Sequence, residues 1–241
     1  MHLLPLVLSL FCAASAAEPQ PLRFAVSESV AMPLMEIDNG EARRGILFDL
    51  HQRIAERLQR PLQQRVVPRL RLRQLMDAGK VDVSCYVNPA WLAGSDRRYL
   101  WTVPFMTHRD LLVGHTPRPE PQLAHLKGER IGTVLGYSYP ALEPLFRSGE
   151  LRRDDGRRQE WVLAKLASRR YRYALSNELS LHWFNRQRPV ASRLWAFDEI
   201  DSYPVSCVVR DDPAVPGRQV LRAMRQMQQA GEFETILARY R

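Results

Sequence analysis

The chain has 241 residues, enough for one large domain or two small lobes. It carries 35 Lys and Arg residues against 26 Asp and Glu residues, a formal net charge of +9. The arginines are scattered rather than gathered in one basic run, which argues against a nucleic-acid partner. The six histidines show no paired helical spacing and no neighbouring cysteine ligand, so we predict no metal and no cofactor.

The first segment has the features of a secretory leader. Residues 3–17 are apolar or small, and this run is too short to span a bilayer. Ala14-Ser15-Ala16 has the small-x-small pattern of a cleavage site, so we predict a signal peptide over residues 1–16. The alternative is a buried N-terminal element. Phe11 is too bulky for a lipoprotein signal before Cys12, and we expect an exported, soluble mature chain.

The spacing of apolar residues predicts strands alternating with helices. Strands are expected over 22–27, 62–68, 81–87, 111–116, 130–136, 171–176 and 203–213. Helices are expected over 46–60, 69–80, 122–128, 139–149, 160–168, 177–187, 218–231 and 232–241. This alternation predicts an α/β architecture with parallel sheets.

Several motifs occur in a recognisable order. They are "GILFDLHQRIAERLQRPLQQRVVPRLRLRQLMDAGKVDV" (45–83), "WTVPF" (101–105), "LKGERIGTVLGYSYPALEPL" (126–145) and the tail from "VVRDDP" to "ILARY". Together they resemble the extracellular solute-binding proteins of the amino-acid type, family 3, which feed ABC importers. The resemblance runs over essentially the whole mature chain.

The resemblance implies a two-lobed periplasmic-binding-protein-like fold of type II. Two α/β lobes would be joined by two crossing strands, near 111–118 and 200–208. Lobe 1 would comprise residues 22–110 plus 205–241, and lobe 2 residues 111–204. A small ligand would lie in the cleft and be trapped when the hinge closes. We therefore expect a periplasmic monomer that serves an ABC importer or a membrane sensor.

The loop after the third strand is expected to line this cleft. Tyr86, Asn88 and Trp91 would offer polar groups and a flat wall. The family holds a ligand carboxylate with an arginine here, and Arg97 and Arg98 are the nearest guanidinium groups. Either of them binds the ligand, or both face solvent as a surface pair.

Two further loops belong to the expected site. Glu28, Ser29 and Met32 follow the first strand. In lobe 2, the turn "GYSYP" (136–140) offers hydroxyl groups from the residues Tyr137, Ser138 and Tyr139. The same turn resembles a hydrolase nucleophile elbow, but Pro140 replaces the closing glycine and no histidine lies beyond His182. We therefore favour binding at this turn.

Asn177 departs from the resemblance. The family often places there an aspartate that receives the ligand ammonium, and an amide lacks that charge. Asn177 is also in position to cap the following helix, and Glu178 is the nearest substitute acid. Arg97 and Arg98 also lie off the position of the family's arginine. Together, these two departures predict weak binding of ordinary α-amino acids.

Cys85 and Cys207 remain after leader removal. The resemblance places their strands side by side, which implies a disulfide in an oxidising compartment. The alternative is a pair of buried free thiols.

The sequence thus predicts a receptor for a small polar ligand, either amino-acid-like or a carboxylate. The alternative is an enzyme on the same fold, similar to cyclohexadienyl or prephenate dehydratase. In that case Glu178 or Glu28 would be the acid, and Arg97 or Arg98 would hold the substrate carboxylates.

Overall fold

A computed structural model describes residues 19–92, 99–116 and 126–241. The predicted signal peptide, Arg97 and Arg98 fall outside these ranges. Among the described residues, no helix is both long and apolar enough to cross a membrane.

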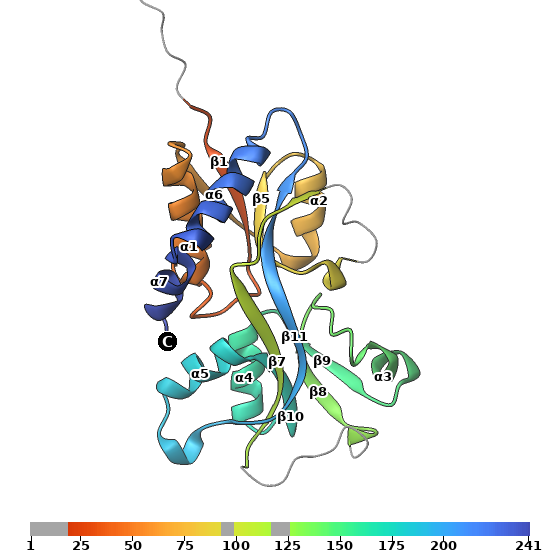
Figure 1. The fold of residues 1–241 in the computed structure, drawn as a ribbon. Coiled ribbons are helices and arrows are strands. Elements are labelled where there is room, and N and C mark those ends of the chain that lie inside the picture. The colour runs from red at the N-terminus through yellow and green to blue at the C-terminus, as the bar shows by residue number, and fades with distance from the viewer. Residues whose placement is uncertain (1–18, 93–98, 117–125) are drawn as a thin grey trace, which may run out of the picture.

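The first lobe is built on parallel strands. Its sheet contains β1 (Leu22–Ser27), β4 (Leu62–Val67), β5 (Val83–Val87) and the short β6 (Tyr99–Trp101). β1 lies between β4 and β5 and is parallel to both. Helices α1 (Ile46–Arg57), α2 (Leu72–Asp77), α6 (Gly217–Gln229) and α7 (Glu232–Ala238) cover this sheet (Figure 1). The apolar stripe of α1, which includes Leu50 and Ile54, is fully buried, as its spacing predicts.

The second lobe contains β8 (Arg130–Val134), β9 (Arg152–Gly156) and β10 (Tyr173–Asn177). β8 is parallel to β9 and β10. Helices α3 (Glu143–Ser148), α4 (Gln159–Ala167) and α5 (Glu178–Arg186) pack around these strands. Asn177 caps α5, because its side chain accepts a hydrogen bond from the Ser180 backbone N–H at 2.9 Å.

Two long strands join the lobes, as the resemblance implied. β7 (Met106–Gly114) and β11 (Trp195–Arg210) run antiparallel to each other through the middle of the molecule (Figure 1). β11 pairs with β7 from Trp195 to Val205, and then with β5 and β6 from Ser206 onward. The result is one nine-stranded sheet that continues from one lobe into the other.

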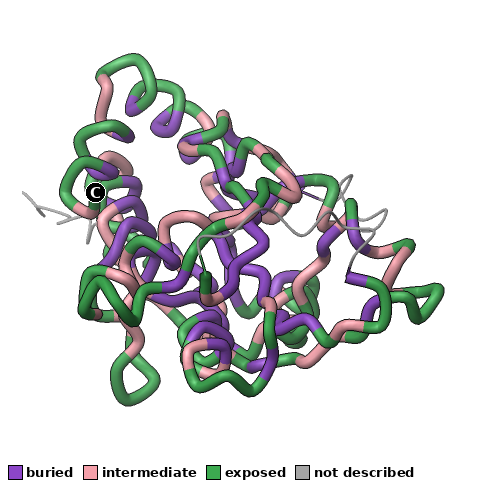
Figure 2. Tube along the Cα trace, turned by 90° about the horizontal axis from the view of Figure 1, so that it is seen from below, coloured by how far each residue is buried: buried purple, intermediate pink, exposed green. Residues whose placement is uncertain are grey.

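Each lobe has its own core. The larger cluster of the first lobe packs residues such as Phe24, Leu50 and Met224, whereas the second lobe has two smaller clusters. Figure 2 shows the buried residues along the inner sides of the elements, with exposed residues outside. The cores are therefore separate, and the lobes are joined mainly through the crossing strands.

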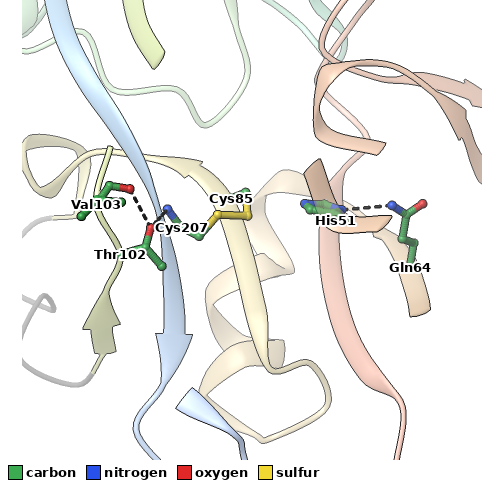
Figure 3. The surroundings of a disulfide bond; sticks show 6 residues. All are labelled: His51, Gln64, Cys85, Thr102, Val103 and Cys207. Carbon is green, nitrogen blue, oxygen red and sulfur yellow. Dashed lines mark hydrogen bonds between the residues drawn. A yellow bond between two sulfur atoms is a disulfide. The ribbon is translucent and has the colours of Figure 1, made fainter. Parts of the chain in front are cut away.

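The disulfide between Cys85 and Cys207 is confirmed. The two residues lie directly opposite each other on β5 and β11, with Cα atoms 3.9 Å apart and sulfur atoms 2.05 Å apart. Next to it, the Cys207 N–H donates to the Thr102 hydroxyl at 2.9 Å, and His51 lies on the other side (Figure 3). The bond lies within the first lobe.

Several elements differ from the predictions. The hairpin of β2 (Glu36–Asp38) and β3 (Glu41–Arg44) and the edge strand β9 were not predicted, because none of them has a clear alternation or apolar run. The short β6 was not predicted either, because its apolar run has only three residues. The predicted helix over 69–80 begins instead as a 3₁₀ turn, η1 (Arg69–Arg71). β7 and β11 both begin earlier than predicted. Their first residues are mostly polar or exposed, so the pattern of apolar residues did not reveal them.

Candidate functional site

A small cavity lies where the two lobes meet. Its first-lobe walls come from the carboxyl ends of β1 and β5, from α1 and from the η1–α2 segment; its second-lobe wall is the turn after β8, and β7 passes between them. The open space is about 40 Å³, enough for a few water molecules. Its polar lining comprises Ser27, Arg69, Ser84, Tyr86, Trp91, His108, Asp110, Tyr137 and Ser138. Open α/β sheets bind ligands at the carboxyl ends of their strands, so this is the candidate site.

Tyr86 reaches the cavity through a β-bulge. Cys85 and Val87 oppose Cys207 and Ser206 directly, so Tyr86 is the extra residue of β5. Its backbone has a φ of +68°, in the left-handed region that residues other than glycine rarely adopt. Bulges often re-aim a side chain next to a functional site, and this one directs the Tyr86 ring into the cavity wall.

Tyr86, His108 and Asp110 form a buried polar chain. The Tyr86 hydroxyl lies 2.5 Å from Nδ1 of His108, and Nε2 of His108 lies 3.0 Å from the Asp110 carboxylate. His108 and Asp110 are two residues apart on β7, so both side chains project from the same face of the strand. Trp91 packs edge-on against the imidazole, with ring centroids 5.0 Å apart.

The Tyr86 end of this chain is a neutral phenol. Burial raises the pKa of the Tyr86 phenol well above its usual value, with a further contribution from Tyr137 and Asp110, so the hydroxyl keeps its proton. This hydroxyl and His108 Nδ1 share one hydrogen bond. On the other side of the ring, Nε2 of His108 faces the Asp110 carboxylate.

A second network joins the lobes at Ser29. The Ser29 hydroxyl is 2.6 Å from that of Ser27 and donates to the Tyr137 hydroxyl of the other lobe at 3.3 Å. The Ser29 carbonyl accepts the Gln159 N–H, at the start of α4, at 3.0 Å. Burial raises the pKa of the Tyr137 phenol, so this group also stays neutral. These contacts hold the cleft closed.

The mouth of the cleft carries another contact between the lobes. The Arg69 guanidinium lies 5.4 Å from the centre of the Tyr137 ring and donates to the Gly136 carbonyl at 3.4 Å. Gly136 has a φ of +75°, and a Cβ there would come within 2.7 Å of Leu70. The backbone conformation therefore favours glycine, whereas the exposed Leu70 side chain could move aside.

Some of the predicted site residues lie in the cavity wall and others do not. Tyr86, Trp91, Tyr137 and Ser138 line it, and Ser29 lies behind it in the Ser27–Tyr137 network. Asn88 is buried but has a structural role, since it bonds the Pro204 carbonyl at 2.7 Å and the Ala90 N–H at 2.8 Å.

Tyr139 does not face the cleft. It is 2% exposed in the core of the second lobe, because its ring packs among apolar residues and its hydroxyl accepts the Val134 N–H. Glu28 and Met32 line two other surface depressions rather than this cavity. Glu178 is 3.5 Å from Arg109, whose side chain projects from the face of β7 opposite to His108 and Asp110. Arg97 and Arg98 lie outside the described residues.

The sequence reasoning missed His108 and Asp110, as well as Ser27, Ser84 and Arg69. A signal for the first two was present, because "MTHRDLLVG" alternates between the two faces of β7 from its first residue. The strand was not predicted to start there, because a prediction based on apolar residues treats a buried polar pair as part of an exposed loop. No three His, Cys, Asp or Glu side chains of the described ranges are arranged to hold a metal ion.

No protein-family model matches the sequence, and a comparison with curated proteins gives no match. Solved structures do match. An ancestral arginine-binding protein bound to arginine superposes with a TM-score of 0.77 at 18% identity, over 91% of this chain and 97% of that one. An arginine transport-system periplasmic binding protein from Legionella pneumophila gives 0.74 at 14%, over 92% and 100%.

An ancestral amino-acid-binding protein, a precursor of cyclohexadienyl dehydratase, gives a TM-score of 0.74 at 13% identity, over 91% of this chain and 95% of that one. All three similarities extend over both lobes and the crossing strands. The protein therefore has the two-lobed α/β fold of the periplasmic binding proteins.

Proposed function

We propose that this protein is a periplasmic receptor that captures a small polar organic ligand between its lobes and presents it to an ABC importer or a membrane sensor. The observation that carries the proposal is the cavity at the carboxyl ends of β1 and β5, closed from the other lobe by Tyr137. The similarity to amino-acid-binding proteins favours a ligand of amino-acid size.

Ligand entry requires the lobes to separate. The space of about 40 Å³ is smaller than an amino acid, and the Ser29–Tyr137, Ser29–Gln159 and Arg69–Gly136 contacts bridge the opening. Two extended strands permit such a hinge motion more readily than a packed domain interface. In this proposal, lobe 1 comprises residues 22–110 plus 205–241, lobe 2 comprises residues 111–204, and the receptor acts as a monomer.

The test is binding. Mature protein, freed of carried-over ligand by partial denaturation and dialysis, is screened by thermal shift against amino acids, polyamines and organic acids. A ligand at 100 times its dissociation constant stabilises the native state by about 2.7 kcal/mol, which gives a clear rise in melting temperature. Calorimetry should then give one site per chain, and X-ray scattering a more compact molecule. Absence of binding across the three classes would overturn the proposal.

The enzyme alternative is less well supported. Neither Glu28 nor Glu178 lines the cavity, and both were the expected acids for a dehydratase. The carboxylate in the cavity wall is Asp110, which lies against His108. Incubation with prephenate, followed by ultraviolet absorbance of an aromatic product, tests this directly; turnover would replace the receptor proposal with a lyase.

A further inference from the structure

Asp110 and Asn177 occupy neighbouring positions on adjacent strands. They are directly paired across the antiparallel ladder of β7 and β10. Side chains of such a pair project from the same face, with Cβ atoms about 4.5–5.5 Å apart. The carboxylate of Asp110 thus originates one strand away from position 177.

The side chains of Asp110 and Asn177 make different contacts. The Asn177 oxygen accepts the Ser180 N–H and so belongs to the cap of α5. Asp110 lines the cavity, is 4% exposed, and has His108 as its one ion-pairing neighbour within the described part of the chain. Position 177 is therefore used for structure, whereas position 110 presents a carboxylate to the cavity.

Within the described ranges no arginine or lysine forms an ion pair with Asp110, and His108 is the neighbour at ion-pair distance. The imidazole of His108 lies between this carboxylate and the Tyr86 hydroxyl. His108 is itself 4% exposed, and its Nε2 makes no well-directed hydrogen bond although it lies 3.0 Å from Asp110. A buried carboxylate without well-directed partners is costly, and a cationic ligand group would offset that cost.

The rings around this carboxylate fit the same chemistry. Tyr86, Trp91 and Tyr137 line the cavity with it. Aromatic faces attract cations through their quadrupole, with Trp the strongest. The wall therefore combines one carboxylate with several rings suited to a positively charged nitrogen, while the Arg69 guanidinium lies at the mouth, over Tyr137.

We propose that Asp110 receives a cationic nitrogen of the ligand, and so supplies from β7 the carboxylate that position 177 on β10 lacks. This inference rests on the proposed receptor function and narrows its ligand class to molecules that carry an ammonium or a similar cation. It also reverses the expectation of weak amino-acid binding, which considered position 177 and not its neighbour across the sheet.

The experiment uses the mature full chain and five probes measured by calorimetry. L-Arginine, L-glutamine and putrescine carry cationic nitrogens, whereas glutaramate and glutarate carry none. We expect the tightest binder to be among the first three, and glutaramate to bind far more weakly than glutamine if glutamine is that binder. This comparison needs no variant, so it remains valid if a substitution disturbs folding.

Variants then test whether Asp110 is the residue that binds the cationic nitrogen. Asp110→Asn keeps the shape and removes the charge, and we expect it to weaken the tightest probe by about tenfold to a hundredfold, the range for a hydrogen bond to a charged group. Glu178→Gln removes a carboxylate that pairs with Arg109 outside the cavity, and should leave affinity unchanged.

Three results would count against the inference. Undiminished affinity in a folded Asp110→Asn variant would overturn it while leaving the receptor function intact. Tightest binding by glutarate or glutaramate would do the same. If none of the five probes binds, the receptor proposal fails for this ligand class and the role of Asp110 fails with it.

Discussion

The two lobes are stabilised in different ways. The first lobe is assembled from distant parts of the chain: the disulfide joins residues 122 positions apart, and Glu232 of α7 pairs with Arg53 and Arg57 of α1. The second lobe is formed by one continuous segment, and its core is divided between two smaller clusters. The first lobe thus depends on connections between the two ends of the chain, whereas the second depends on strand pairing and packing within its own segment.

The difference suggests a division of labour. A lobe tied by a covalent bond and by its own C-terminal helices is suited to be a rigid platform. A lobe held to it by two strands and a few contacts at the cleft is suited to move. Four predictions test this division, beginning with the largest expected effect.

The largest effect should come from the disulfide. Replacing Cys85 and Cys207 together by alanine should lower the unfolding free energy by about 2–5 kcal/mol, because a long loop is released in the unfolded chain. Calorimetric melting should show the loss in the first lobe. Reduction of the parent protein is the control and should reproduce the shift, whereas the double variant should not respond to reductant. An equal loss in both lobes would contradict the division.

The second effect comes from His51, which is buried between α1 and the sheet of the first lobe. Burial lowers the pKa of its imidazole from 6.5 to about 3. Between these values the unfolded chain binds a proton that the folded chain does not, so stability falls as the pH drops below 6.5. The slope is about 1.4 kcal/mol per pH unit, or roughly 2 kcal/mol between pH 6.5 and 5.

His51→Phe preserves the ring that stacks on Phe24, with centroids 4.2 Å apart in the parent, and removes the titration. Its unfolding free energy, from denaturant curves at several pH values, should vary less than that of the parent over this range. Substitution of the exposed His182 by glutamine serves as the matched control and should retain the parent slope. Parallel curves for His51→Phe and the parent would contradict the assignment.

The third effect is local to the second lobe. Asn177→Ala removes the cap of α5 and should lower stability by about 1 kcal/mol. Asn177→Ser retains a capping oxygen without placing a second carboxylate opposite Asp110, and should remain closer to the parent. Hydrogen exchange should show increased opening in α5 and β10, with little change in α1 or α6. If exchange rises equally in the first lobe, the lobes are more tightly coupled than their separate cores suggest.

The smallest effect concerns the contact between the lobes. Arg69→Ala removes the guanidinium over Tyr137, a contact of about 0.5–1 kcal/mol at a partly exposed site. The closed state should lose that amount, so the affinity for a confirmed ligand should fall by about two- to fivefold with melting almost unchanged. Arg71→Ala, on the same 3₁₀ turn, is the control. Equal affinities for both variants would remove Arg69 from the closing contacts.

Much of the fold could be predicted from the sequence, because long amphipathic segments carry clear signals. The buried stripe of α1, the end of the η1–α2 segment at Gly79 (φ +66°) and the cap at Asn177 all follow from local patterns. The disulfide could be predicted only through the resemblance, since the register of β5 and β11 depends on the whole sheet.

The site was less predictable. The bulge that turns Tyr86 into the cavity depends on how β5 and β11 align, which the spacing of apolar residues does not encode. The pairing of Asp110 with Asn177 likewise appears only when β7 and β10 are placed side by side. Tyr139 is only two residues from Tyr137, but its ring lies in the core of the second lobe while that of Tyr137 lines the cavity. The direction of each ring depends on the conformation of the turn after β8, which the residue pattern does not encode.

The position of the disulfide has a mechanical consequence. β11 leaves β7 after Val205 and joins β5 through a register shift at Ser206 and Cys207, so the covalent bond fastens the strand at the joint itself. If the lobes open as we propose, β11 would bend beside this bond, which would fix the pivot and make successive openings follow the same arc. Without the bond, the pivot could wander along β11, and a receptor that opened equally far would no longer bring Tyr137 back to the same place.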